Sequence, residues 1–192
     1  MLSIPNDDKE FIQMYDGLIT YADTNETQNI VERLFDLIDD CNKSEYHDIA
    51  ISLFVNDYVA FPEEFKKNPM VFNKMIDILK DSSNWKQQLE AISGFINAFD
   101  DTYDITHGRD LDMDFTDEFK QLIEDNLILL SNVVTNITNH LKTEYENNPE
   151  EFKIQMSTTV IDFYEMIPKI LRTKELKQLY RLFISKKLWS NK

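Results

Sequence analysis

The 192-residue chain has little of several residue types on which particular folds and chemistries depend. A single cysteine excludes a disulfide framework and the usual multi-cysteine metal sites. Only three glycines and five prolines are present, which favours long helices over a turn-rich β fold. The sequence contains no apolar run of about 18 residues and does not begin like a leader peptide. We therefore expect no transmembrane segment and an intracellular, cytoplasmic protein, with the nucleus as the alternative compartment.

Basic residues are also scarce. Lysine and arginine number 20 against 35 aspartates and glutamates, so the formal net charge is −15. The negative charge is unevenly distributed along the chain, because residues 168–192 carry a formal charge of +7 and the first 167 residues carry −22. An acidic body repels nucleic-acid phosphate, so we expect no nucleic-acid binding through it. A basic protein or peptide is the expected partner, and a role of the charge in solubility alone is the alternative.

Signatures of catalysis are missing. The sequence has no glycine-rich phosphate loop, no nucleophile elbow and no paired-cysteine motif. The three histidines, His47, His107 and His140, lie in unrelated contexts without metal-ligand spacing. Cys41 ends an apolar segment and is most simply a small buried hydrophobe. We therefore expect a protein that is not an enzyme, with no catalytic residues and no cofactor.

What the sequence does contain is helical periodicity. Apolar residues make up 42 % of the chain, which is enough for a core, and they recur three and four residues apart. Ser82 or Ser83 is the expected N-cap of the fifth helix. About eight helices are predicted, at residues 8–22, 26–41, 44–59, 69–80, 84–99, 116–145, 149–168 and 174–188.

A seven-residue phrase occurs twice, 41 residues apart, as AISLFVN at residues 50–56 and AISGFIN at residues 91–97. The similarity extends upstream without a gap, because Asp36 corresponds to Asp77 and the surrounding apolar residues also correspond. Self-similarity with a period of about 40 to 47 residues is typical of HEAT and armadillo arrays. In such arrays each unit buries its apolar face by stacking on its neighbours. The alanines and phenylalanines of the phrase are accordingly expected in the core.

The stretch from Met70 to Asn97 resembles one armadillo repeat. An apolar helix ends at Ile78 and Leu79, a polar turn follows, and Gln88-Leu89-Glu90-Ala91 opens the next helix before Phe95 and Asn97. Residues 30–56 resemble the preceding repeat. The resemblance implies an all-α fold, a short right-handed solenoid of armadillo/HEAT-like repeats. We expect a single domain over residues 1–192, with the clearest repeats at 26–60 and 69–99, a loop at 100–116 and a basic closing helix at 169–192.

The resemblance also implies binding residues. In peptide-binding armadillo proteins an asparagine late in the third helix bonds the backbone of an extended peptide, and Asn56 and Asn97 fall on that position. A side-chain amide suits this task because it offers a donor and an acceptor. Ser52 and Ser93 stand where importin alpha has a tryptophan, which argues against tryptophan-lined recognition of nuclear-localisation signals. The alternative is that both asparagines only bond between neighbouring helices.

Two further segments could carry a ligand. Asp110, Asp112 and Asp114 alternate in the acidic loop and are a weak calcium candidate. An EF-hand would need glycine and glutamate where Phe115 and Gln121 stand, and acids before a helix also favour its dipole without any ligand. The basic amphipathic segment 174–192 could touch an anionic membrane or close the solenoid, and we favour the closing helix.

These observations predict a non-enzymatic protein–protein interaction adaptor or regulatory subunit that binds a basic protein or peptide on an acidic helical surface. The alternative is a compact all-helical effector, inhibitor or immunity protein that acts by binding a target protein.

Overall fold

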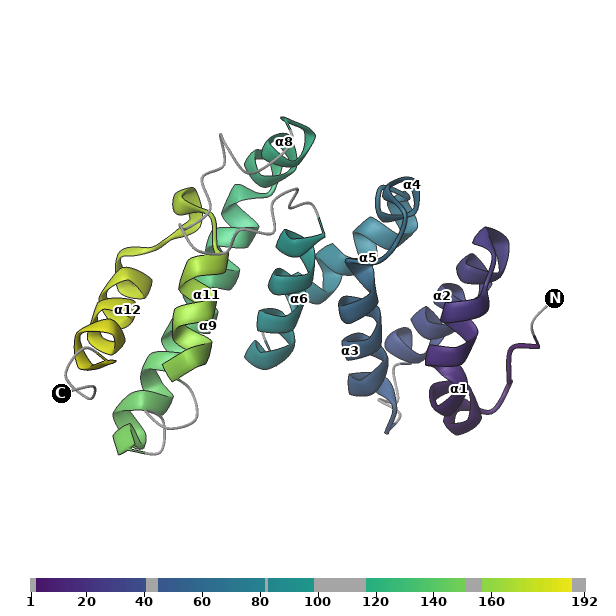
Figure 1. The fold of residues 1–192 in the computed structure, drawn as a ribbon, viewed down its shortest axis with the longest axis horizontal. Helices are drawn as coiled ribbons and strands as arrows, with labels where there is room; N and C mark the ends of the chain where they lie inside the picture. Colours follow the sequence, from purple (N-terminus) through teal and green to yellow (C-terminus); the bar gives the residue numbers. More distant parts are fainter. Residues whose placement is uncertain (1–2, 41–44, 82, 99–116, 151–156, 188–192) are drawn as a thin grey trace. The chain divides into compact units, whose positions relative to one another are not determined.

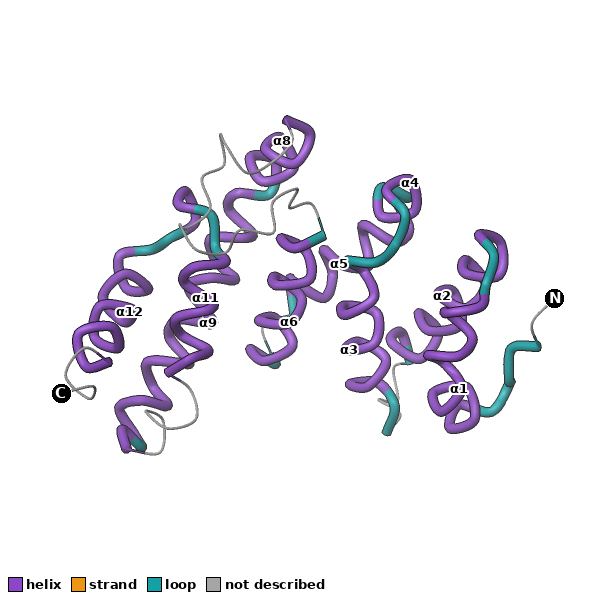
Figure 2. The backbone as a smooth tube through the Cα atoms, in the orientation of Figure 1, coloured by secondary structure: helices purple, strands orange, loops and turns teal. Residues whose placement is uncertain are grey.

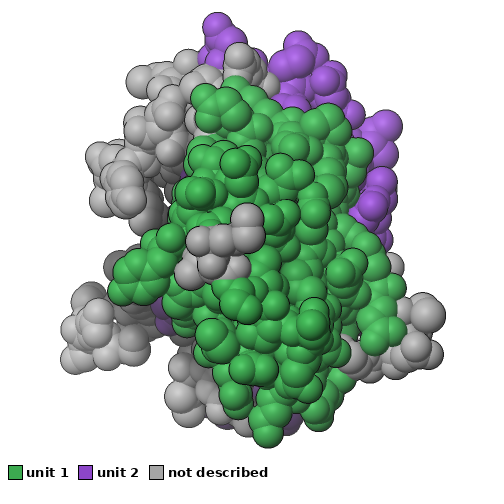
Figure 3. Space-filling view, turned by 90° about the vertical axis from the view of Figure 1, so that its right-hand side faces the viewer, with its two compact units in different colours: residues 1–74 green, residues 75–192 purple. Residues whose placement is uncertain are grey.

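The computed structural model describes residues 3–40, 45–81, 83–98, 117–150 and 157–187. Within these residues the chain forms ten α-helices and one 3-10 helix, without a strand (Figures 1 and 2). The predicted all-α class is therefore confirmed. The chain divides into two compact units, residues 1–74 and residues 75–192, which Figure 3 shows in different colours.

Unit 1 is built around its second helix. α2 packs against both α1 and α3. The buried residues of α2 are Ile30, Val31, Leu34, Phe35, Leu37 and Ile38. The helices of this unit are α1 (Asp8–Tyr21), α2 (Thr24–Asp39), α3 (His47–Tyr58), α4 (Glu63–Lys66) and the first half of α5 (Pro69–Lys80).

Aromatic rings fill the core of unit 1 beside α3. The Phe54 ring meets the Phe35 ring edge to face, with centroids 5.0 Å apart, and Phe61 meets Phe65 at 5.1 Å. Tyr58 is fully buried, and its hydroxyl donates to the carbonyl of Lys66 at 3.2 Å. Edge-to-face pairs of this kind add about 0.5–1.5 kcal/mol to the burial of the rings themselves. The short helix α4, which was not predicted, is thereby fixed to the core.

Unit 2 is arranged around α9. This long helix packs against α6, α8, α12 and the 3-10 helix, and α11 packs against α12 and α6. The elements of unit 2 are the second half of α5, α6 (Trp85–Asn97), α8 (Asp117–Asp125), α9 (Leu127–Asn147), α11 (Ser157–Met166), η2 (Lys169–Leu171) and α12 (Lys174–Lys187).

Several helix boundaries differ from the prediction. The expected helix 116–145 is two helices, α8 and α9, which are separated at Asn126. The backbone of Asn126 departs from helical angles, with φ −110° and ψ 14°, and its side chain donates to the carbonyl of Leu122 at 2.9 Å. Asn84 caps α6 by accepting from the Lys86 and Gln87 amides, whereas Ser82 or Ser83 was predicted.

The C-terminal helix α12 buries its apolar stripe inside unit 2. Leu176, Leu179 and Phe183 are buried against the unit, and the Phe183 ring meets Tyr145 of α9 edge to face at 5.4 Å. No helix in the described part of the chain is long and apolar enough to cross a membrane.

Candidate functional site

The repeated phrase has nearly the same burial in its two copies, on α3 and on α6. In both copies the alanine, the first isoleucine, the phenylalanine and the following aliphatic residue are buried. The serines, Ser52 and Ser93, are half-buried, and the asparagines, Asn56 and Asn97, are exposed. The predicted core positions are confirmed, and the asparagine is the one residue of the phrase that is exposed in both copies.

A groove in unit 2 runs between α6 and α11, which lie side by side in Figure 1. We call it the α6–α11 groove. Its volume is about 530 Å³. The α6 wall is formed by Leu89, Ser93 and Asn97, and the α11 wall by Thr159, Asp162, Phe163 and Met166. Two of the four predicted binding residues therefore line one cavity.

The spacing of the lining residues explains why they share a cavity. On α6 they recur every four residues, and on α11 every three or four, so each set forms one stripe along its helix. Phe163 is 2 % exposed and lies deepest, while Leu89 and Met166 are half-buried. Asn97 and Asp162 are exposed. The groove thus combines an apolar lining with polar groups that solvent reaches.

Gln88, the residue before Leu89, fixes α6 in place. Its side-chain amide donates to the carbonyl of Leu79 at 2.9 Å and accepts from the Asn136 side chain of α9 at 2.6 Å. Gln88 is 2 % exposed, so these bonds form in the interior of the unit. The matching residue of the first copy is His47, whose Nδ1 is buried without a hydrogen-bond partner among the described residues. This anchor is therefore present in the second copy alone.

The other wall, α11, is held at its C-terminal end by Arg172. The Arg172 guanidinium donates to the carbonyls of Ile167 at 2.8 Å and Glu165 at 3.3 Å, and it lies over the Tyr164 ring at 4.4 Å. Cations at this end of a helix also complement its dipole. Tyr164 stacks on Tyr180 of α12 with centroids 3.7 Å apart.

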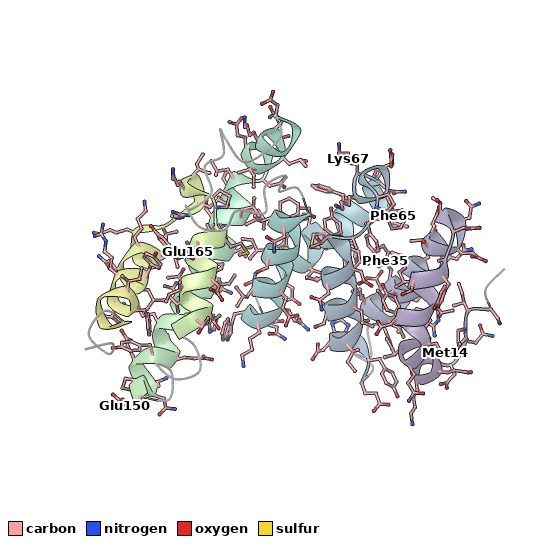
Figure 4. All side chains as sticks on the ribbon, viewed as in Figure 1. Met14, Phe35, Phe65, Lys67, Glu150 and Glu165 are labelled. Atoms are coloured by element: carbon pink, nitrogen blue, oxygen red, sulfur yellow. The ribbon has the colours of Figure 1, made fainter. Side chains whose placement is uncertain are left out.

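Glu165, labelled in Figure 4, completes this contact between α11 and α12. Its carboxylate accepts from the Tyr180 hydroxyl at 3.2 Å. Partial burial and the nearby carboxylate raise the pKa of Tyr180. The hydroxyl therefore stays protonated and available as a donor at neutral pH, so that α12 supports the wall of the groove.

The other predicted residues lie elsewhere. Ser52 and Asn56 belong to α3 in unit 1 and do not line the α6–α11 groove. The calcium candidates Asp110, Asp112 and Asp114 lie outside the described residues. Among the residues that the structure describes, no cluster of histidine, cysteine, aspartate and glutamate could hold a metal ion.

The α11 residues of the groove were not predicted from the sequence as binding residues. Thr159, Asp162, Phe163 and Met166 have the spacing of a helical stripe, but so does every core-facing stripe. Their distance from the repeated phrase, more than 60 residues from Asn97, gave no reason to join the two sets. The preference of α11 for α6 is a property of the tertiary packing.

A second polar feature lies inside unit 1. The Tyr15 hydroxyl of α1 faces the Asp57 carboxyl group of α3, yet neither the hydroxyl nor Asp57 Oδ2 makes a hydrogen bond of ordinary geometry within the described residues. Burial, together with the charge of Asp57, raises the pKa of Tyr15. Burial and the charge of Asp16 also raise the pKa of Asp57, although the contact with Tyr15 opposes this shift. We therefore infer that this pair lowers the free energy of unfolding of the chain.

The chain matches no protein-family model, no curated protein and no solved structure. The resemblance to armadillo repeats accordingly stays a prediction from the residues that carry it.

Proposed function

We propose that the chain is a non-enzymatic interaction adaptor or regulatory subunit that binds a basic protein or peptide in the α6–α11 groove. We further propose that its repeated helix pairs belong to a short right-handed solenoid of armadillo-like repeats. The observation that carries the binding proposal is the groove itself, which Ser93 and Asn97 of the repeated phrase line together with Asp162 of α11.

The chemistry of the lining supports a protein ligand. Leu89, Phe163 and Met166 supply apolar surface, and methionine adapts to partners of different shape. Asn97 is exposed, and a side-chain amide carries both donor and acceptor groups. Grooves with an apolar floor and a polar rim are the usual form of such interfaces.

The charge of the chain supports a basic ligand. Among the described residues of the lining, Asp162 alone is ionisable, and the formal charge of the whole chain is −15. Complementary charge speeds the encounter of partners and disfavours acidic ones, although an exposed ion pair adds only about 0.2–1 kcal/mol. The apolar contacts must therefore supply most of the affinity, and the charge supplies selectivity.

Three pools of random 14-residue peptides, enriched in basic, neutral or acidic residues, provide a direct test of this proposal. The fraction of each pool retained by the immobilised full chain is measured. We expect the basic pool to be retained most, and Asn97→Ala to lower its affinity about fivefold without changing the melting temperature.

The matched control is Asn132→Ala, which removes an exposed asparagine of α9 outside the groove lining. Equal retention of acidic and basic pools would contradict the proposal. So would an Asn97→Ala chain that binds the basic pool as the Asn132→Ala chain does.

A further inference from the structure

We infer that the segment held in the α6–α11 groove is a short amphipathic helix with two or more large apolar side chains on one face and a lysine or arginine that pairs with Asp162. The inference rests on the proposed function and adds the conformation and side-chain chemistry of the ligand.

The shape of the groove favours a helix. Both walls are helix faces, and the α6 stripe from Leu89 to Asn97 extends over eight residues, which is about 12 Å. Two turns of a third helix have this length, and helices pack by placing rows of side chains into such grooves. Anchors of the ligand at positions i and i+4, or i, i+3 and i+7, would follow the same stripe.

The hydrogen-bonding capacity of the walls also favours a helical ligand. The Ser93 hydroxyl already donates to the carbonyl of Leu89 at 2.7 Å, and Asp162 as a carboxylate can accept but not donate. An extended ligand buries backbone N–H and C=O groups along its whole length. Leu89, Phe163 and Met166 of the lining offer these groups no partner, and Asn97 and Thr159 are the remaining polar residues of the described lining, so that some buried groups stay unpaired at a cost. A helix satisfies these groups internally, so that only its side chains need partners.

The position of the charge sets where the basic residue of the ligand must lie. Asp162 is exposed on α11, directly before the buried Phe163. A lysine or arginine beside an apolar anchor can lay its methylene stem over the apolar lining and place its charge at the carboxylate. The ligand is thus basic at the edge of its apolar face.

Phage display of random 14-residue peptides against the full chain provides the probe. The most enriched peptide is synthesised with a fluorescent label, and its affinity is measured by anisotropy. We expect apolar residues with helical spacing and an adjacent lysine or arginine in its sequence. We also expect a gain of helical circular dichroism on binding, and a loss of at least tenfold in affinity when a central residue is replaced by proline.

Variants of the full chain locate the binding site. Asp162→Lys should lower the affinity about fivefold or more, and Met166→Ala should lower it about tenfold. The matched control for the charge reversal is Glu124→Lys, which changes an exposed acid of α8 outside the lining. Melting temperatures of all variants show whether each chain is folded.

The outcomes separate the inference from the proposed function. A peptide that binds without gaining helicity and tolerates proline overturns the helical ligand. Peptides that bind the Asp162→Lys and Glu124→Lys chains equally overturn the role of Asp162, while the adaptor function stands. If no peptide is enriched, both the inference and the proposed function fail.

Discussion

At the scale of single residues, the chain separates positions that stabilise its fold from positions that weaken it. Gln88 satisfies a backbone carbonyl in the interior of unit 2, whereas Asp57 in unit 1 has a buried carboxylate oxygen without an ordinary hydrogen bond in the described part of the chain. These two residues therefore lead to predictions of opposite sign.

Replacing Asp57 by asparagine should raise the stability of the chain at neutral pH. Burial raises the pKa of Asp57 in the folded state, so the folded chain binds its proton more tightly than the unfolded chain. Wild-type stability should therefore fall as the pH rises from about 3.9, the ordinary pKa of aspartate, through the raised value. Because Asp57 is half-buried, solvent screening limits the expected gain to about 0.5 kcal/mol.

Urea unfolding at pH 4 and pH 7 measures this effect. The Asp57→Asn chain should lose less stability than the wild type over this interval, and Asp36→Asn, at an exposed position of α2, is the matched control. If the stability of all three chains depended on pH in the same way, folding would not raise the pKa of Asp57.

Replacing Gln88 by alanine should destabilise the chain by about 1–3 kcal/mol, because the Leu79 carbonyl loses its buried donor. Thermal or urea unfolding gives the value, with Gln178→Ala on the exposed face of α12 as the control. Equal unfolding midpoints for the two variants would mean that water replaces the Gln88 amide at no cost.

At the scale of helices, side chains near the helix ends satisfy backbone groups. Asp23 and Glu26 form a capping box at the start of α2, in which each side chain bonds the backbone of the other residue. Arg172 satisfies carbonyls at the end of α11 and lies over a ring of the same helix. The walls of the groove depend on such terminal contacts as well as on buried apolar faces.

Replacing Arg172 by lysine should cost about 1 kcal/mol, because an ammonium group cannot donate to both carbonyls while covering the Tyr164 ring. Since the charge is kept, the change tests geometry alone. Urea unfolding compares this variant with Arg181→Lys, which makes the same change at an exposed position of α12. Identical midpoints would show that charge, and not the shape of the guanidinium, holds this end of α11.

Helix positions could be predicted from the sequence because apolar spacing is local information. The bounds expected for the fourth helix, 69–80, agree with those of α5. The N-cap at Asn84 and the helix boundary at Asn126 were not predicted, because an asparagine side chain bonds to nearby backbone both at helix starts and at helix breaks. The repeated phrase singled out Ser93 and Asn97 on the α6 side of the groove. The α11 half was not, because nothing in residues 159–166 indicates which helix they face.

At the scale of the whole molecule, the 41-residue repeat and the charge are the features from which the proposals follow. The two copies share their burial pattern, and the chain divides into units of 74 and 118 residues. The strong excess of acidic residues is the reason for proposing a basic partner.

Solution X-ray scattering tests the proposed solenoid. A compact globule of 192 residues would have a radius of gyration of about 16 Å. A stacked array of helix pairs is longer, so we expect a clearly larger radius and a pair-distance distribution with an extended tail. A radius near that of the globule, with a symmetric distribution, would favour the compact effector-like alternative.

The most direct test of the binding site is methyl NMR of the full chain with the selected peptide. The chain has seven methionines, of which Met166 lines the α6–α11 groove and Met14 is exposed on α1 in unit 1 (Figure 4). With ¹³C-labelled methyl groups, assigned by single Met→Leu substitutions, we predict that the peptide shifts the Met166 signal and leaves Met14 unchanged. A shift of Met14 with an unchanged Met166 signal would contradict binding in the groove.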